Sequence, residues 1–110
     1  MKDDKLLSLI GLATKAGKTS RGTYAAEDSV KKGRAKLAII ASDAGENTKR
    51  SIIGICGSFK VEYIICSAKE DLAHWCGKPS ISVLCVNDDN FKNMIMNAYK
   101  QTNNSGGALK

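Results

Sequence analysis

The chain has 110 residues and a formal net charge of +6, and 43% of its residues are hydrophobic. A chain of this length can bury one core but not two, and its hydrophobic content is too high for a disordered protein. No apolar run approaches the roughly 18 residues that a membrane-spanning helix needs. Residues 1–4 carry two acids and lead into a periodic segment, so we expect no signal peptide and a cytoplasmic location.

The first third of the chain predicts two helices. Hydrophobic residues recur at helical spacing over residues 4–16, and Gly17 ends this predicted helix. Residues 19–22 form a short extended link. A second helix follows over residues 23–32, and Gly33 ends it.

The middle of the chain predicts two strands around a third helix. Residues 37–41 form a continuous apolar run, which is typical of a strand covered on both faces. Asn47 is the predicted cap of a helix over residues 47–59, and residues 61–66 form a second strand. The inner face of the helix is predicted to carry Ile52, Ile53, Cys56 and Phe59.

The last part predicts another helix, strand and helix. Residues 67–70 match a capping box that opens a helix over residues 68–76. Residues 81–86 form a strongly apolar strand, and either Asp88 or Asp89 caps the last helix. The buried face of that helix is predicted to carry Phe91, Met94, Ile95, Ala98 and Tyr99.

Helices and strands therefore alternate along the whole chain. This alternation predicts an α/β protein with one sheet between two helical layers, a three-layer α/β/α sandwich. Neither repeats nor linkers interrupt the pattern, so we expect a single domain over residues 1–102. Residues 103–110 are polar and contain two glycines, and we expect them to form a disordered tail.

The chain lacks the usual signatures of catalysis and metal binding. Residues 17–19, Gly-Lys-Thr, resemble the end of a phosphate-binding P-loop, but Gly11 lies one residue too far away and a helix precedes them where a strand is required. The single histidine, His74, has no marked acid or nucleophile as partner. We expect no enzyme activity, metal or cofactor, and we expect reduced core cysteines at Cys56, Cys66, Cys76 and Cys85.

Basic residues are concentrated in the first part of the chain. Residues 15–36 carry seven of them against two acids, whereas residues 61–110 are balanced. A basic stripe indicates a polyanion partner, although a solvated helix face is the alternative. A helix N-terminus with a glycine can bring backbone N–H groups close to a phosphate. The candidate nucleic-acid contacts are therefore Lys18, Ser20, Arg21, Gly22, Thr23, Lys31 and Lys32.

Four segments resemble one known family. Residues 9–18, 21–22, 33–43 and 46–48 are similar to the ribosomal protein L-seven-Ae/L-thirty-e family. The run AKLAIIASDAGENTKR is closest to the bacterial branch known as YlxQ-type proteins, and the resemblance covers about residues 5–100. It implies an L-thirty-e-like α/β/α sandwich whose central mixed sheet has about four strands.

The resemblance also implies binding to kink-turns, which are RNA helices bent sharply beside tandem G·A pairs. Members lay the N-terminus of their second helix into the widened groove, and the loop before the last strand covers the bulged bases. A third loop, at residues 42–44, lies close by. In this sequence the implied contacts are Arg21, Gly22, Thr23 and Tyr24, then Asp43, then Lys78, Pro79 and Ser80.

The sequence departs from the strong binders of this family. They carry Gly-Thr-Asn-Glu or Gly-Thr-Lys-Gln and then a lysine, whereas residues 22–25 are Gly-Thr-Tyr-Ala and Asp28 occupies the lysine position. This favours a weak, ribosome-linked or structured-RNA role over tight autonomous binding, and we expect the chain to be a monomer. The alternative is a ribosome-associated adaptor that binds a protein partner and has little RNA affinity of its own.

Overall fold

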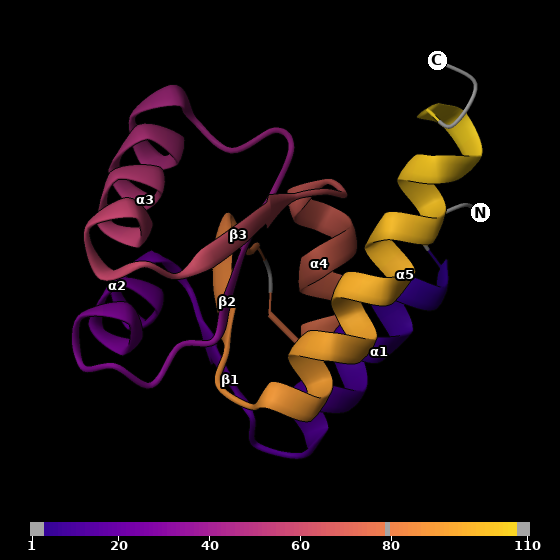
Figure 1. The fold of residues 1–110 in the computed structure, drawn as a ribbon, viewed down its shortest axis with the longest axis horizontal. Coiled ribbons are helices and arrows are strands. Elements are labelled where there is room, and N and C mark those ends of the chain that lie inside the picture. The colour runs from indigo at the N-terminus through magenta and orange to yellow at the C-terminus, as the bar shows by residue number, and fades with distance from the viewer. Residues whose placement is uncertain (1–3, 79, 108–110) are drawn as a thin grey trace.

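The computed structural model describes residues 4–78 and 80–107. Five helices and four strands alternate along this part of the chain (Figure 1). In order, they are α1 (Asp4–Lys15), β1 (Thr19–Arg21), α2 (Thr23–Lys31), β2 (Leu37–Ile40), α3 (Glu46–Phe59), β3 (Glu62–Ile65), α4 (Lys69–Cys76), β4 (Val83–Val86) and α5 (Asp89–Gly107).

The strands form one mixed sheet in the order β1-β4-β2-β3. β4 runs antiparallel to both of its neighbours, β1 and β2, whereas β2 and β3 are parallel. All four residues of β2 and of β4 are buried, because these two strands are central and covered on both faces. The predicted mixed sheet of about four strands is confirmed.

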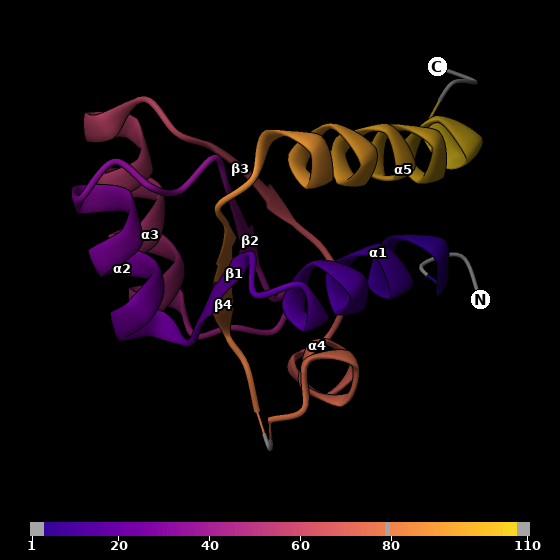
Figure 2. The ribbon, with the colours of Figure 1, turned by 90° about the horizontal axis from the view of Figure 1, so that it is seen from below.

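The helices form two layers, as predicted for an α/β/α sandwich. In Figure 2 the sheet separates α2 and α3 on one side from α1, α4 and α5 on the other. The contacts agree, since α2 packs on α3 and β4, while α1 packs on α4 and α5. The core between these layers contains Leu6, Ile10, Val30, Ile39, Ile52, Leu84 and Ile95, among other side chains.

Two of the predicted helix caps are wrong. α3 begins at Glu46 after Gly45, and no side chain caps it, so Asn47 is an exposed residue of its first turn. At α4 the N-cap is Ala68 instead of the predicted Ser67, and the capping box does not form. Ser67 has φ of 61°, and its carbonyl accepts the N–H and hydroxyl of Ser42, so this residue turns the chain away from β3.

Two predicted core positions lie at the surface. Phe59 is 48% exposed because it is the last residue of α3, where the helix ends beyond its packing against the sheet. Met94 is 42% exposed, since α5 is buried through Ile95 and Ala98 instead. The other cap is as predicted: the Asp88 carboxylate accepts the N–H of Phe91 at 2.9 Å.

The ends of the chain add two observations. α5 continues from Asp89 to Gly107, so part of the segment predicted as a tail is helical, and residues 108–110 lie outside the described range. The domain boundary at residue 102 stays a prediction. Within the described ranges, no helix combines the length and the apolar character that crossing a bilayer requires.

Candidate nucleic-acid interface

The candidate interface lies where β1, β2 and β3 end and β4 begins. We call this end of the sheet the Gly22 edge; its described residues are 20–24, 42–45, 77–78 and 80–82. Three backbone hydrogen bonds hold its loops together: Gly22 donates to Val83 at 2.9 Å, Ala41 to Ser82 at 2.8 Å, and Ser42 to Ser67 at 2.8 Å. The antiparallel β4 therefore brings the α4–β4 loop beside the start of α2, although about 55 residues separate them in sequence.

Gly22 gives this edge an open backbone. Its φ of 100° and ψ of 158° suit glycine, and a Cβ atom added there would meet no atom within 4 Å. The N–H groups in the first turn of any helix have no intrahelical acceptor. In α2 no side chain caps them either. These groups and the partial positive charge of the helix end favour an anionic ligand.

An exposed aromatic ring stands at the same helix end. Tyr24 is 84% exposed, the highest value among the large exposed hydrophobic residues of the described chain. Thr23 beside it is half-buried. A ring in this position can stack on an unpaired base, because every base offers a π-face.

The guanidinium of Arg21 is held by the protein itself. Its Nη1 donates a hydrogen bond of 2.7 Å to the carbonyl of Cys76, the last residue of α4. Ser20 is also engaged, since its hydroxyl accepts a hydrogen bond of 3.0 Å from Asn87. Both bonds fix β1 to its surroundings, but only Arg21 points to the predicted site, since the Ser20 hydroxyl meets Asn87 beyond the end of β4, toward the opposite end of the sheet. The Cys76 carbonyl and the Asn87 amide carry no sequence signal that would have revealed these roles.

The α4–β4 loop places two further predicted residues at the surface. Gly77 ends α4 in the left-handed conformation, and the N–H of Lys78 donates to the Ala73 carbonyl at 3.0 Å. The side chains of Lys78 and Ser80 are exposed. Pro79, which the resemblance also implicates, lies outside the described residues.

Asp43 has a structural role at this edge. Its Oδ1 accepts the N–H of Lys69 at 2.9 Å, so it caps α4 from the neighbouring loop. Lys49 was missed by the sequence analysis: its ammonium donates to the Ser42 carbonyl at 2.8 Å and lies beside the Asp43 loop. The spacing of residues in α3 alone gives no sign of this contact.

Three of the predicted contacts are not brought to the Gly22 edge. Lys18 precedes β1 and lies at the opposite end of the sheet, where its carbonyl accepts the N–H of Asn87. Lys31 is the last residue of α2 and Lys32 is its C-cap, about 13–15 Å along the helix from Gly22. Lys32 also pairs with Asp28 at 3.4 Å.

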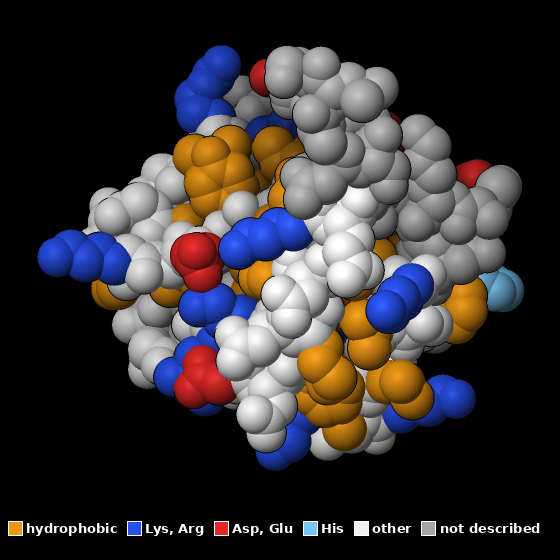
Figure 3. All heavy atoms as spheres, turned by 45° about the vertical axis from the view of Figure 1, so that its right-hand side comes forward, with side chains coloured by type: hydrophobic (Ala, Val, Ile, Leu, Met, Phe, Trp, Pro, Cys, Tyr) orange, Lys and Arg blue, Asp and Glu red, His pale blue; other side chains and the backbone are white. Residues whose placement is uncertain are grey.

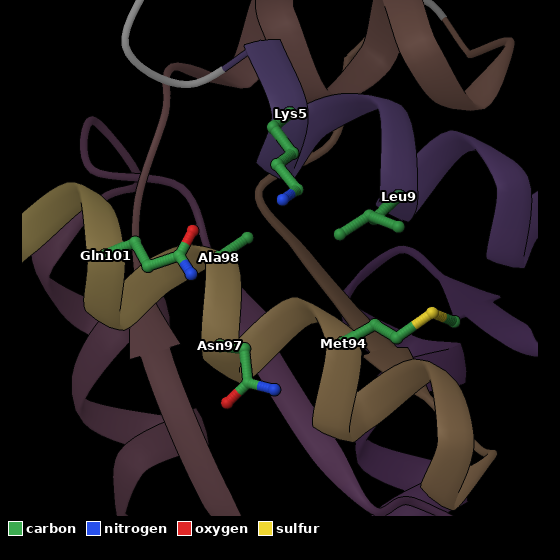
Figure 4. Close-up of a pocket in the computed structure, with 6 residues that line it drawn as sticks. All are labelled: Lys5, Leu9, Met94, Asn97, Ala98 and Gln101. Atoms are coloured by element: carbon green, nitrogen blue, oxygen red, sulfur yellow. The ribbon is translucent and has the colours of Figure 1, made fainter.

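Two hollows lie on the other helical layer. One, of about 280 Å³, lies between α1 and α5 and includes Lys5, Leu9 and Met94 (Figure 4). The other lies between α1 and α4 beside the exposed Leu12 and Trp75. Figure 3 shows hydrophobic side chains between lysines or arginines on this side of the molecule. Neither hollow contains a predicted contact residue.

The cysteines belong to the core, as predicted. All four are buried, and none of them forms a disulfide. Burial raises the pKa of the thiols of Cys56 and Cys76, and it raises the pKa of Cys85 to about 12. Among the described residues, no group of three or more potential metal ligands comes together.

The model of the ribosomal protein L7Ae/L30e/S12e/Gadd45 family matches residues 4–96. The chain belongs to this family. It is 31% identical over 88 residues to the RNA-binding protein YlxQ of Bacillus subtilis strain 168, a match that covers 80% of this chain and 88% of that protein. It is also 31% identical over 75 residues to the YlxQ protein of Enterococcus faecium, covering 68% and 73% of the two chains. The YlxQ-type branch predicted from the sequence is therefore confirmed.

Solved structures support the family fold. A Bacillus halodurans protein of unknown function superposes with a TM-score of 0.83 and 30% identity, covering 87% of this chain and 97% of that one. The Giardia lamblia 15.5kD RNA binding protein superposes with a TM-score of 0.75 and 22% identity, covering 92% and 87%. At that identity the second likeness establishes the fold alone.

Proposed function

We propose that this L7Ae-family chain binds structured RNA without catalysing a reaction, and that its Gly22 edge binds a sharply bent RNA helix of the kink-turn type. The observation that carries the proposal is the uncapped N-terminus of α2, opened by Gly22 and lying beside the loop that precedes β4. Two similar bacterial proteins named as RNA-binding support RNA as the ligand.

The chemistry of this edge favours recognition of shape. The backbone N–H groups of α2 bind phosphate oxygens, and Tyr24 stacks on a base that the bend has released. RNA specificity in this arrangement comes from unstacked bases, because the deep groove of an A-form helix is closed to side chains. Gly22 lets the RNA backbone approach without a Cβ in the way.

A binding comparison tests the proposal. The wild-type chain is titrated by calorimetry with a kink-turn RNA and with a straight duplex of equal length. We expect tighter binding of the kink-turn, and Tyr24→Ala should weaken it by about tenfold, since one base stack contributes about 1–3 kcal/mol. Tyr63→Ala on β3, at the far side of the sheet, is the matched control and should leave the affinity unchanged. Equal affinity for the two RNAs would overturn the proposal.

We also place the chain in the cytoplasm as a monomer that associates with the ribosome through ribosomal RNA. The rival function is a ribosome-associated adaptor that binds a protein. The bond between Arg21 and the Cys76 carbonyl favours this rival, because it occupies a cation that the RNA would use. An adaptor would sediment with ribosomes and show no binding to a naked kink-turn, which separates the two functions.

A further inference from the structure

A dense group of exposed positive charges lies at the end of the sheet opposite the Gly22 edge. There β1 and β2 begin, β4 ends, and the C-termini of α1 and α2 arrive (Figure 1, lower side; Figure 2 is seen from this side). We call this end the basic edge. Its cations, all exposed, are Lys15, Lys18, Lys31, Lys32, Arg34 and Lys36.

The end of β4 holds two of these lysines in place. The carbonyl of Lys18 accepts the N–H of Asn87 at 2.8 Å, and the N–H of Lys36 donates to the Val86 carbonyl at 2.8 Å. β1 and β2 flank β4, so the two backbones are two strand spacings apart, roughly 10 Å. Residues that are 18 positions apart in the chain therefore form one fixed pair.

The end of α2 is joined to the same point. The hydroxyl of Ser29, which is fully buried, donates to the side-chain oxygen of Asn87 at 2.8 Å. The carbonyl of Ser29 accepts the N–H of Arg34 at 2.9 Å. These bonds place the last turn of α2 and its basic residues next to the pair formed by Lys18 and Lys36.

The acids at this edge leave most of its charge unbalanced. Asp28 lies 3.4 Å from Lys32 and from Arg34, so it pairs with these two cations. Asp88 and Asp89 open α5 nearby, and the Asp88 carboxylate already accepts the N–H of Phe91. Within residues 4–78 and 80–107, no carboxylate forms an ion pair with Lys15, Lys18, Lys31 or Lys36.

The Gly22 edge differs in its charge. Its exposed or half-buried cations are Arg21 and Lys78, and Lys49 and Lys69 lie beside its loop at residues 42–45. Acids stand among them, because Asp43 caps α4 and the first turns of α3 and α4 carry Glu46, Glu70 and Asp71. The long-range attraction for a polyanion is therefore stronger at the basic edge.

We propose that the basic edge is a second RNA-binding surface, which holds the phosphate backbone of an RNA segment other than the one at the Gly22 edge and reads no sequence. The inference rests on the proposed function only in naming RNA as the polyanion. Exposed lysines on fixed strand ends displace condensed counterions from the phosphates, so binding here depends strongly on salt. The two surfaces together let one chain contact two segments of a folded RNA.

The test is a salt titration of the intact chain. Affinity for kink-turn RNA is measured between about 50 and 200 mM salt for the wild type and for the double variant Lys18→Gln/Lys36→Gln. The kink-turn RNA carries an extended helical stem, so that a second segment is present. Losing two phosphate contacts should flatten the slope of log K against log salt by about 1.4–1.8.

A matched control has the same charge change elsewhere. Lys5→Gln/Lys100→Gln removes two exposed lysines on α1 and α5 and should leave the slope close to wild type. An equal loss of slope in both double variants, or no loss in Lys18→Gln/Lys36→Gln, would overturn the second surface. If the ligand of the basic edge is an acidic protein instead of RNA, the salt slope for RNA should also be unchanged in Lys18→Gln/Lys36→Gln.

The same variants separate this inference from the proposed function. In one outcome, Tyr24→Ala leaves RNA affinity unchanged while Lys18→Gln/Lys36→Gln lowers the affinity for both kink-turn and duplex. This would support RNA binding at the basic edge and contradict the proposed role of the Gly22 edge. If Tyr24→Ala weakens the kink-turn alone and the lysine variant changes nothing, the proposed function stands and the second surface fails.

Discussion

The two ends of the sheet present different chemistry to solvent. The Gly22 edge offers an uncapped helix N-terminus, an exposed ring and a glycine backbone, while its nearest cation is bonded to the Cys76 carbonyl. The basic edge offers exposed lysines on the ends of β1, β2 and α2, with few acids to balance them. The Gly22 edge can therefore recognise the shape of a ligand, and the basic edge can attract its negative charge.

β4 is the element that both ends share. It lies between β1 and β2, begins at the Gly22 edge and ends at the basic edge. Selectivity and salt dependence can therefore be assigned to separate parts of one small domain. Changes to β4 affect both parts, whereas changes to surface residues affect one.

The largest expected effect is alkaline unfolding, which removes both edges together. Burial raises the pKa of Cys85 on β4 from 9.0 to about 12, so the folded state keeps the thiol proton while the unfolded state loses it. The stabilisation is complete below pH 9 and is lost as the pH rises toward 12. The free energy of unfolding should fall by about 1.4 kcal/mol per pH unit in this window.

Urea unfolding at a series of pH values measures this loss. Cys85→Ala serves as the control: the lost side chain lowers stability by an amount that does not depend on pH, and the alkaline slope should become shallower because only the raised thiols of Cys56 and Cys76 still contribute. An identical alkaline slope in wild type and variant would show that the Cys85 thiol is not responsible.

A smaller effect is expected from Arg21→Ala at the Gly22 edge. The variant leaves the Cys76 carbonyl without its charged donor, which should cost about 1.5–3 kcal/mol of unfolding free energy. Thermal denaturation measures it. Lys18→Gln at the basic edge is the comparison and should shift the melting temperature by no more than about 2–4 °C, because surface changes of this kind are usually within ±0.5 kcal/mol. Similar melting temperatures for the two variants would show that the hydrogen bond from Arg21 to the Cys76 carbonyl adds no measurable stability.

Gly22→Ala tests the backbone of the same edge. A non-glycine residue at φ of 100° is strained, and we expect a loss of about 1–2 kcal/mol although the added Cβ meets no atom. Gly54→Ala is the matched control, since Gly54 lies inside α3 with open space around it and normal helical φ. That control should stabilise the chain by about 0.5–1 kcal/mol. Changes of the same sign in urea unfolding would contradict the assigned backbone conformation.

The smallest effect concerns Asp43. Asp43→Ala removes the cap of α4 and should cost about 1 kcal/mol, whereas Asp43→Asn keeps an oxygen for the Lys69 N–H and should cost less. Asp43→Asn should also tighten RNA binding slightly, because it removes a negative charge beside the bound phosphates. Weaker RNA binding by Asp43→Asn would indicate that the carboxylate contacts the RNA directly.

Much of the fold follows from local patterns in the sequence. The apolar runs of β2 and β4 and the helical spacing in α1 predict their elements within a few residues, because a buried central strand or an amphipathic helix needs those patterns. The predicted cap of α3 is wrong because the helix begins one residue earlier, after Gly45, and the predicted cap of α4 is wrong because the decisive contact comes from outside the helix. Asp43 caps α4 from a loop that lies 26 residues earlier.

The candidate site was predictable in part. The glycine before α2 and the exposed Tyr24 could be located from the sequence and from the family resemblance. The bond from Arg21 to Cys76 and the contact of Lys49 with Ser42 could not, since each joins elements whose relative placement depends on packing.

By itself, the sequence determined the alternation of helices and strands, the family, and the concentration of basic residues between positions 15 and 36. Only the tertiary structure decided that this basic stretch divides between two ends of the sheet. β1 and α2 run in opposite directions between those ends, so Lys18 before β1 and Lys32 after α2 meet at one end while Gly22 lies at the other. Separation in sequence predicts which residues are neighbours only within one helix or strand. The direction in which each helix and strand packs decides which charged residues of different elements lie close together.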